Sequence, residues 1–214
     1  QNLRANKLRS FLTMFGILWG VISVVILSAT GEGFRLGNER VLRELGKNVV
    51  IVWGGRTSKQ AGGERAGRRI HLTVEDARAL ARDSEMVAVV SPEIQRGAIR
   101  VKSAFNAATL TVHGVEPDYQ DVRTIDIERG RGLRFTDEEG SHRVAVIGAD
   151  AAAQLFATSN AVGQGVQLNG VPYVVVGTLR KKDQDSSYSG PDNDKVFIPY
   201  STMARDFPRT DAGA

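Results

Sequence analysis

The sequence SFLTMFGILWGVISVVILSATG, residues 10–31, decides how this chain is organised. It is 22 residues long and contains no charged side chain. A helix rises about 1.5 Å per residue, so this stretch reaches about 33 Å, enough to cross the hydrocarbon core of a bilayer. We therefore predict a transmembrane helix over residues 10–31.

The charges on the two sides of this apolar segment differ in sign. Arg4, Lys7 and Arg9 precede it, whereas Glu32 is the first acid in the chain. The positive-inside rule then predicts a cytoplasmic flank over residues 1–9, with the rest of the chain on the other side of the membrane.

A cleaved signal peptide is the alternative interpretation of the same segment. Its basic start and the small residues 28–31 fit that pattern, but the apolar part of a signal peptide is usually about 7–15 residues long. A retained helix is therefore favoured. Inside it, Gly16 and Gly20 are four residues apart, a spacing that lets two membrane helices pack closely, so they are candidates for helix packing.

Residues 32–46 continue the apolar segment with a second pattern. Apolar side chains recur there at helical spacing with Arg and Glu between them, so we predict a stalk helix that leads outward. Gly31, Gly33 and Gly37 weaken this helix, each by up to about 1 kcal/mol relative to alanine. They are candidate hinge residues of a bendable stalk, and a loose linker beside the membrane is the alternative.

The 28 basic and 24 acidic residues are unevenly placed along the chain. Three basic residues precede the apolar segment and every acid follows it, which leaves 25 basic against 24 acidic residues outside. Such a balanced surface does not favour a nucleic-acid partner. The chain has no cysteine, so the outer part must fold on its apolar core without disulfides.

Residues 47–214 alternate between strand and helix patterns, which predicts a single α+β domain with a mixed sheet. Strands are predicted from β-branched or alternating runs at 48–55, 86–92, 97–103, 106–115, 142–148, 166–180 and 195–199. Helices are predicted at 74–83, 149–156 and from 200, with a short helix or turn at 117–125. Thr73 and Asp76 form a capping box, and Asn169–Gly170 supplies a hairpin turn.

Motifs for nucleotide chemistry and zinc binding are missing from the sequence. It has no GxxxxGK[ST], the loop that cradles phosphates, so we expect no nucleotide hydrolysis by this route. His71, His113 and His142 lie far apart, and no cysteine can join them as a ligand. We therefore predict no catalytic, cofactor-binding or metal-binding residues, and no enzymatic activity.

One stretch imitates a calcium-binding loop. Asp183, Asp185 and Ser187 occupy its first, third and fifth positions. However, the sixth position needs glycine for a sharp turn and holds Tyr188 instead. A polar loop between strands is the favoured interpretation.

With these elements in place, the sequence resembles the MacB-like ABC transporter permeases, a family of macrolide and peptide exporters, lipoprotein-releasing permeases and the more distant FtsX-like proteins. The resemblance rests on the order and spacing of short motifs along the whole chain. They are NKLRS (6–10), LT (12–13), GI (16–17), GV (20–21), GEG (31–33), LG (45–46), LTVED (72–76), GVEPDY (114–119), RVAVIG (143–148), VGQ (162–164) and VFIPYST (196–202). In RGRGLRFTDEE (129–139) a second Arg-Gly departs from the family pattern, which leaves the local turn open.

The resemblance implies a first transmembrane helix followed by a periplasmic core domain, residues 47–214, truncated at its C-terminus. It also implies a bacterial inner-membrane location and a permease that pairs with a second copy or a paralogue. A partner ATPase would bind ATP on the cytoplasmic side, and the outer domain would transmit the motion to release or export a substrate. A periplasmic adaptor and membrane lipid are further expected partners, and an FtsX-like module that controls a cell-wall hydrolase is the alternative function.

Overall fold

The chain forms two units, Gln1–Arg43 and Glu44–Ala214, and each is described by itself. The computed structural model describes residues 7–45, 49–58, 67, 69–157, 160–182 and 189–208, without the side chains of 38–45.

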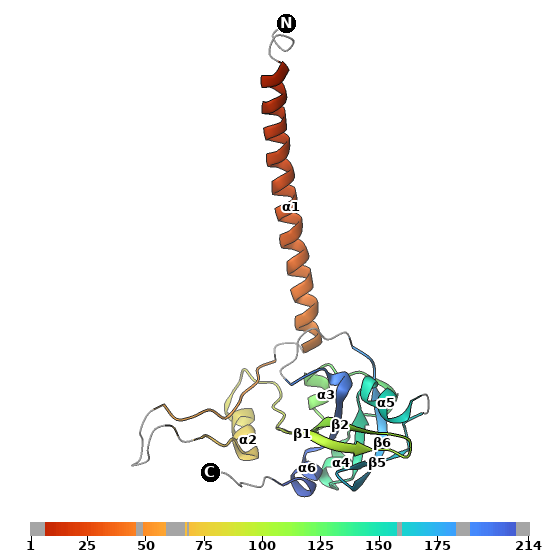
Figure 1. The fold of residues 1–214 in the computed structure, drawn as a ribbon. Helices are drawn as coiled ribbons and strands as arrows, with labels where there is room; N and C mark the ends of the chain where they lie inside the picture. Colours follow the sequence, from red (N-terminus) through yellow and green to blue (C-terminus); the bar gives the residue numbers. More distant parts are fainter. Residues whose placement is uncertain are drawn as a thin grey trace. The chain divides into compact units, whose positions relative to one another are not determined.

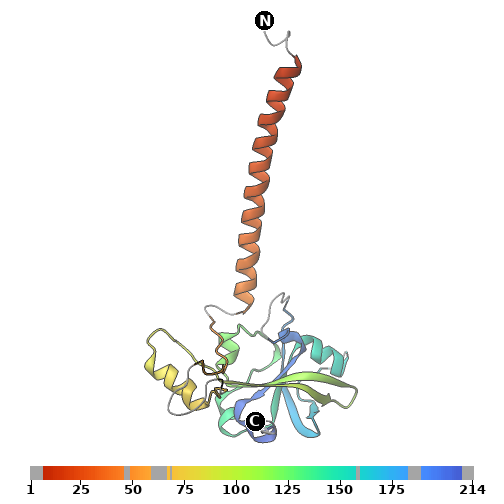
Figure 2. The same cartoon turned by 60° about the vertical axis from the view of Figure 1, so that its left-hand side comes forward.

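The first unit is built on one helix, α1 (Lys7–Leu45), of 39 residues (Figures 1 and 2). It confirms the predicted helix over residues 10–31 and its continuation as a stalk. The helix runs without a break through all of the glycines that were named as packing or hinge candidates. Gly46, where the stalk was predicted to end, lies outside the described residues.

Among the residues of the second unit that the structure describes, seven strands form one mixed sheet. They are β1 (Glu93–Lys102), β2 (Ala107–Val115), β3 (Ile127–Gly130), β4 (Val144–Ile147), β5 (Gly165–Leu168), β6 (Val171–Leu179) and β7 (Lys195–Pro199). Their order is β3-β6-β4-β7-β2-β1-β5, and β5 also pairs with β6, so six of the strands close into a small barrel with β3 added on β6. The β2–β7 and β4–β6 pairs are parallel and the others antiparallel.

In the described part of the second unit, five α-helices and one 3₁₀ turn accompany the sheet (Figure 1). They are α2 (Val74–Asp83), α3 (Tyr119–Val122), α4 (Phe135–Glu139), α5 (Ala149–Phe156), η1 (Asp192–Asp194) and α6 (Tyr200–Asp206). Below, the sheet body means the described part of residues 93–208, and the 49–92 segment means the described residues before it.

Apolar side chains fill both faces of the two central strands, β4 and β7. Ile147 and Ile198 point into the larger cluster with α5 and α6, whereas Val146 and Phe197 point into a smaller cluster with Tyr119 of α3. A strand that is buried on both faces reads as a continuous apolar run, which is the pattern predicted for these two stretches.

The predictions that rest on local residue chemistry are confirmed. Thr73 caps α2 as expected, because its side chain accepts from the Asp76 amide while the Asp76 carboxylate accepts from the Thr73 amide. Asn169 and Gly170 both have positive φ, 47° and 88°, which is the backbone geometry that joins β5 to β6.

Two predicted strands, 48–55 and 86–92, are wrong. The described residues of both stretches are irregular, and one isolated bridge, Arg56 with Arg69, is the sole strand pairing in the described part of the 49–92 segment. Both stretches have the β-branched residues of a strand. A strand also needs a neighbour along its length, and none of the described residues supplies one.

The turn left open at residues 129–139 is now defined, and it contains two elements that the sequence did not indicate, β3 and α4. Gly130 has a φ of 78°, and an added Cβ would clash with the Val176 carbonyl. Asp137 then fixes the next turn, because it accepts from both terminal nitrogens of Arg131, at 2.6 and 3.0 Å, and from the Arg134 amide. Burial alone would raise the pKa of Asp137, but these bonds hold it below its usual value.

Candidate functional site

The surface of α1 is the first candidate site, because it is apolar over a membrane-spanning length. Residues 7–37 form a helix that is long and apolar enough to cross a bilayer. The hydroxyls of Thr13, Ser23 and Thr30 each donate to a carbonyl one turn earlier, so these polar groups are satisfied within the helix. Lipid requires this of every polar group that it covers.

The predicted orientation residues lie at the start of this helix. Lys7 and Arg9 are exposed in its first turn, and Arg4 lies outside the described residues. At the other end of the apolar stretch, Glu32 forms an ion pair with Arg35 at 2.6 Å, and hydrogen bonding to Arg35 lowers the pKa of Glu32. The orientation itself stays a prediction.

The candidate glycines share one property in α1. A Cβ added at Gly16, Gly20, Gly31, Gly33 or Gly37 would meet no atom within 4 Å. Packing among the described residues therefore does not demand glycine at any of them. Their roles in helix packing and in bending stay predictions.

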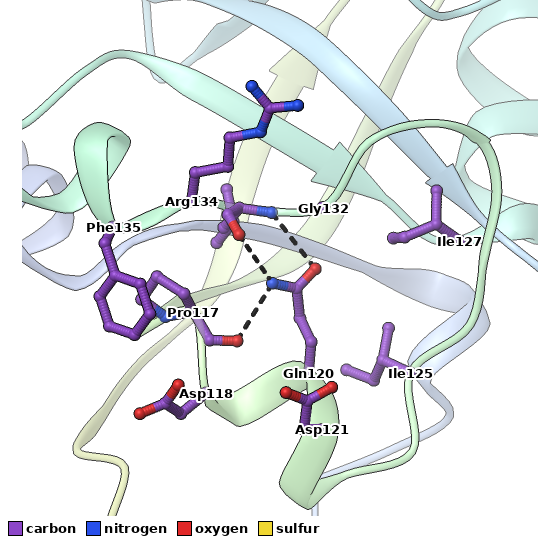
Figure 3. Close-up of a pocket in the computed structure, with 10 residues that line it drawn as sticks. Pro117, Asp118, Gln120, Asp121, Ile125, Ile127, Gly132, Arg134 and Phe135 are labelled. Carbon is purple, nitrogen blue, oxygen red and sulfur yellow. Dashed lines mark hydrogen bonds between the residues drawn. The ribbon is translucent and has the colours of Figure 1, made fainter.

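The second candidate site is a hollow of about 410 Å³ on the sheet body (Figure 3). It lies between α3, the loop into β3 and the start of α4. Its lining residues are Pro117, Asp118, Gln120, Asp121, Ile125, Ile127, Gly132, Leu133, Arg134 and Phe135. Sequence reasoning missed this site, because its residues come from three short stretches that touch only after folding.

Gln120 holds the two walls of the hollow together (Figure 3). Its amide nitrogen donates to the carbonyls of Pro117 and Leu133, both at 3.1 Å, and its amide oxygen accepts from the Leu133 N–H at 3.2 Å. Gly132 lets this side chain come close, since an added Cβ would clash with the Gln120 oxygen. The hollow is therefore formed before any ligand arrives.

Charge and apolar surface are segregated around the hollow. Ile125 and Leu133 are buried members of the smaller core cluster, whereas Phe135 stands exposed at the rim. Asp118 and Asp121 form no ion pair among the described residues, and Figure 3 shows the Arg134 guanidinium turned away from both. The result is an apolar floor beside two unneutralised carboxylates.

A nearby carboxyl, that of Glu116, is partly buried and lies among other charged groups. Burial raises the pKa of Glu116, and repulsion from Glu138 and Asp118 raises it further against the weaker opposing effect of Arg78. Glu116 is adjacent in the chain to Pro117, a lining residue, but is not itself among the residues that line the hollow.

Two of the three histidines, His113 and His142, contact different carboxylates. His113 is buried and its Nδ1 contacts a Glu93 carboxylate oxygen, whereas His142 lies 3.6 Å from Asp137 on the surface. Across the part of the chain that the structure describes, no group of three His, Asp or Glu side chains is placed to hold a metal. The calcium-like positions, Asp183, Asp185 and Ser187, lie outside the described residues.

Two buried ion-pair clusters were not foreseen from the sequence. Lys195 donates to Asp192 at 2.8 Å with both side chains almost fully buried, and Arg123 lies 3.5 Å from the other carboxylate oxygen. The sequence does show two of the three partners: Lys195 begins the apolar run KVFIP, and Asp192 lies three residues before it. Nothing in the sequence indicated the third partner, which comes from a distant segment.

The second cluster surrounds Asp206 at the end of α6. Its carboxylate accepts from Arg143, Arg205 and Tyr173, at 2.8–3.1 Å for the closest contacts. These bonds, that from Arg143 above all, hold the pKa of Asp206 well below its usual range. Burial and the bond to Asp206 raise the pKa of Tyr173. Both clusters join segments that are far apart in the sequence, and none of their residues lines the hollow.

Residues 10–213 match a family model described as the MacB-like periplasmic core domain. The chain belongs to this family. Among curated relatives, it is 33% identical over 205 residues to the macrolide export ATP-binding/permease protein MacB of Vibrio parahaemolyticus, covering 94% of this chain and 30% of that protein. It is 35% identical over 202 residues to MacB 1/2 of Paracoccus denitrificans, covering 94% and 29%. The MacB-like chain thus spans about 30% of the length of these relatives.

Solved structures show the same fold. The crystal structure of the periplasmic region of MacB from Actinobacillus actinomycetemcomitans aligns with a TM-score of 0.60 at 23% identity, over 81% of this chain and 72% of that one. The extracellular domain of the transporter YknZ from Gram-positive bacteria aligns with a TM-score of 0.56 at 22% identity, over 64% and 67%. The α+β fold and the MacB-like family are therefore confirmed.

Proposed function

We propose that this chain is part of an ABC transporter permease that transmits motion across a bacterial inner membrane. In this proposal residues 1–9 are cytoplasmic, α1 crosses the membrane, and the sheet body lies in the periplasm. A partner ATPase binds and hydrolyses ATP on the cytoplasmic side. The chain itself supplies no catalytic group and couples the motion to export or release of a substrate outside.

The unbroken helix α1 carries this proposal. Its 39 residues correspond to about 58 Å of helix, roughly 25 Å more than the apolar stretch needs to cross a bilayer. A continuous helix resists compression and bending, because every backbone hydrogen bond links one turn to the next. The polar part of α1, residues 32–45, is therefore suited to carry a displacement from the membrane to the outer domain.

The proposal includes a second permease and a periplasmic adaptor. Gly16 and Gly20 would let a partner helix approach closely within lipid. The relatives are named as export ATP-binding/permease proteins, which supports the ATPase partner, while the paired permease and the adaptor remain part of the proposal. The transported substrate is not part of the proposal, because no residue pattern in the chain selects one.

A break in the stalk tests the coupling. Leu36 lies in the polar part of α1, and Leu36→Pro removes a helical hydrogen bond at a cost of about 3 kcal/mol or more. In the full-length transporter, Leu36→Pro should abolish substrate export while ATP hydrolysis continues, and Leu36→Ala should behave as the parent. Normal export by an assembled Leu36→Pro transporter would contradict the proposal.

The three stalk glycines allow the stalk to be made stiffer instead of being broken. Replacing Gly31, Gly33 and Gly37 together by alanine should stabilise the helix by about 1–3 kcal/mol, and no atom stands in the way of the new methyl groups. If these glycines form a hinge, the triple variant should assemble with its ATPase but export poorly. Normal assembly together with normal export would show that the hinge assignment is wrong.

A further inference from the structure

We propose that the hollow beneath Gln120 is a docking site for a partner protein segment that presents a lysine or arginine beside an apolar side chain. The site is separate from the stalk, and the proposal does not depend on the transport function. Three features of the hollow lead to it: its charge, its floor and the strand beside it.

The first feature is an unneutralised pair of acids. Asp118 is the residue before α3 and makes no capping hydrogen bond, and Asp121 lies exposed one turn later. Neither forms an ion pair among the described residues, and the guanidinium of Arg134 points away from them in Figure 3. Two carboxylates without a fold-stabilising task favour a cationic ligand.

The second feature is the apolar floor with an aromatic rim. Ile125, Ile127 and Leu133 line the base, and the Phe135 side chain is 58% exposed. A ligand that carries only a charge would leave the apolar floor and Phe135 exposed to solvent. A ligand with an apolar group next to its charge would cover Phe135 and the floor while its cation meets the acids.

The third feature is the free edge of β3, which favours an extended peptide over a small molecule. The Arg180 N–H donates to the Asp126 carbonyl at 2.9 Å, so the next residue, Ile127, turns its own N–H and C=O to the opposite edge. Among the described strands β3 pairs with β6 alone. An added strand could therefore bond to Ile127 while its side chains enter the hollow.

The rigidity of the site lowers the entropy lost on binding. The Gln120 side chain is already hydrogen-bonded to both walls. Gly132 lies next to it, where a residue with a Cβ would clash with the Gln120 amide. Binding therefore needs no rearrangement of the walls, and a short segment can bind with measurable affinity.

Labelled peptides test the proposal on the whole chain in non-ionic detergent micelles. The probe is an eight-residue peptide that alternates arginine and leucine. One comparison peptide replaces arginine by glutamate, and the other replaces leucine by serine. Fluorescence anisotropy should show the first peptide binding more tightly than both others, with an affinity that falls as salt is raised.

Variants show where on the protein the peptide binds. Because all of them are measured in the same micelles, binding of the peptide to detergent affects each measurement equally. Asp118→Asn with Asp121→Asn should weaken the arginine–leucine peptide about threefold to tenfold, the range expected for two exposed charge pairs. The matched control, Glu75→Gln with Asp83→Asn, makes the same charge change on α2 and should leave binding unaltered. Phe135→Ser should weaken binding without changing its salt dependence.

Three results would overturn the proposal. They are equal weakening by the hollow variant and the control, equal binding of the glutamate peptide, and no binding of the arginine–leucine peptide at millimolar concentration. The double asparagine variant should remain folded, because the carboxylate of neither aspartate makes a hydrogen bond with another described residue, and the substitutions leave the backbone hydrogen bonds of both residues in place. Its free energy of unfolding, measured in the same micelles, should equal that of the parent.

Discussion

The sheet body and the 49–92 segment follow one another in the chain but differ in what they bury. Every buried apolar side chain in the described part of the chain belongs to the sheet body, and no described residue of the 49–92 segment is buried. The segment is nevertheless rich in exposed apolar side chains: Val50, Val52, Trp53, Ile70, Leu72, Leu80, Met86 and Val89. Apolar composition alone therefore does not make a core.

Helix α2 shows the same contrast on a smaller scale. It has a complete capping box, two acids in its first turn and a basic residue in its last, so its ends are well stabilised. None of its residues is buried. Its stability is therefore local, whereas that of the sheet body is shared among many contacts.

The largest difference between the two regions should appear when a large aromatic side chain is removed from each. Phe156 is 1% exposed in the core and Trp53 is 66% exposed. Phe156→Ala should lower the free energy of unfolding by about 3–5 kcal/mol, because it removes buried surface and leaves a cavity. Trp53→Ala should change it by less than about 0.5 kcal/mol. Chemical denaturation of both variants in the same detergent measures the difference, and similar costs would contradict the contrast.

Adding a methyl group, instead of removing a side chain, should also distinguish the sheet body from the 49–92 segment. A Cβ at Gly114 would overlap the Cβ and Cγ of Met203, so Gly114→Ala should cost about 1–3 kcal/mol of unfolding free energy. Gly55 has no atom within 4 Å of an added Cβ, and Gly55→Ala should be nearly neutral. Thermal unfolding of the pair provides the test, and a neutral Gly114→Ala variant would show that the α6–β2 contact is loose.

The Asp206 cluster should make the sheet body sensitive to acid. The pKa of Asp206 is lower in the folded than in the unfolded chain, so its ionised form stabilises the fold above about pH 4. This contribution is lost as the pH falls below that value. Since Arg143 and Arg205 are each 47% exposed and screened by solvent, Asp206→Asn should cost about 1–2 kcal/mol at pH 7.

The cost of Asp206→Asn should shrink as unfolding is measured at lower pH. Asp83→Asn, which removes one carboxylate from α2 outside the cluster, is the matched control for the loss of a charge. A pH-independent cost for Asp206→Asn would mean that the lost stability comes from packing and not from the ionised carboxylate.

The smallest expected effect concerns the cap of α2. Thr73→Ala removes one of the two reciprocal bonds of the capping box, which is worth about 1 kcal/mol to the helix. Since α2 buries nothing, this loss should speed hydrogen exchange of the α2 amides while the amides of β4 and β7 keep their protection. Faster hydrogen exchange in both regions, by similar factors, would show that α2 unfolds together with the sheet body.

The comparison also explains which parts of the fold the sequence could predict. The Thr73–Asp76 cap and the Asn169–Gly170 turn depend on residues a few positions apart, so local chemistry suffices for them. The runs at 48–55 and 86–92 have the composition of strands, but whether such a run forms one depends on a neighbour that local sequence does not reveal. Long-range partners therefore limit the prediction of this fold.

The hollow and the Asp206 cluster lie beyond local reasoning for the same reason. Gln120 becomes a link between two walls only when Leu133 folds against it, and neither residue belongs to a recognisable motif. The carboxylate of Asp206 gathers donors from three separate parts of the chain. In contrast, the length of the apolar stretch 10–31 is visible directly in the sequence, so the long apolar helix α1 was the most predictable element.

Labelling of single cysteines tests most directly that α1 anchors the sheet body outside the cytoplasm. Residues 1–214 contain no cysteine, so Asn2→Cys and Glu85→Cys each add a single thiol to them, and any cysteine elsewhere in the full-length protein is first replaced by serine. In spheroplasts that express the full-length protein, a membrane-impermeant maleimide should label Glu85→Cys at once and Asn2→Cys only after the membrane is permeabilised. Labelling of Asn2→Cys with protection of Glu85→Cys in intact spheroplasts would contradict the orientation and the proposed role in transport.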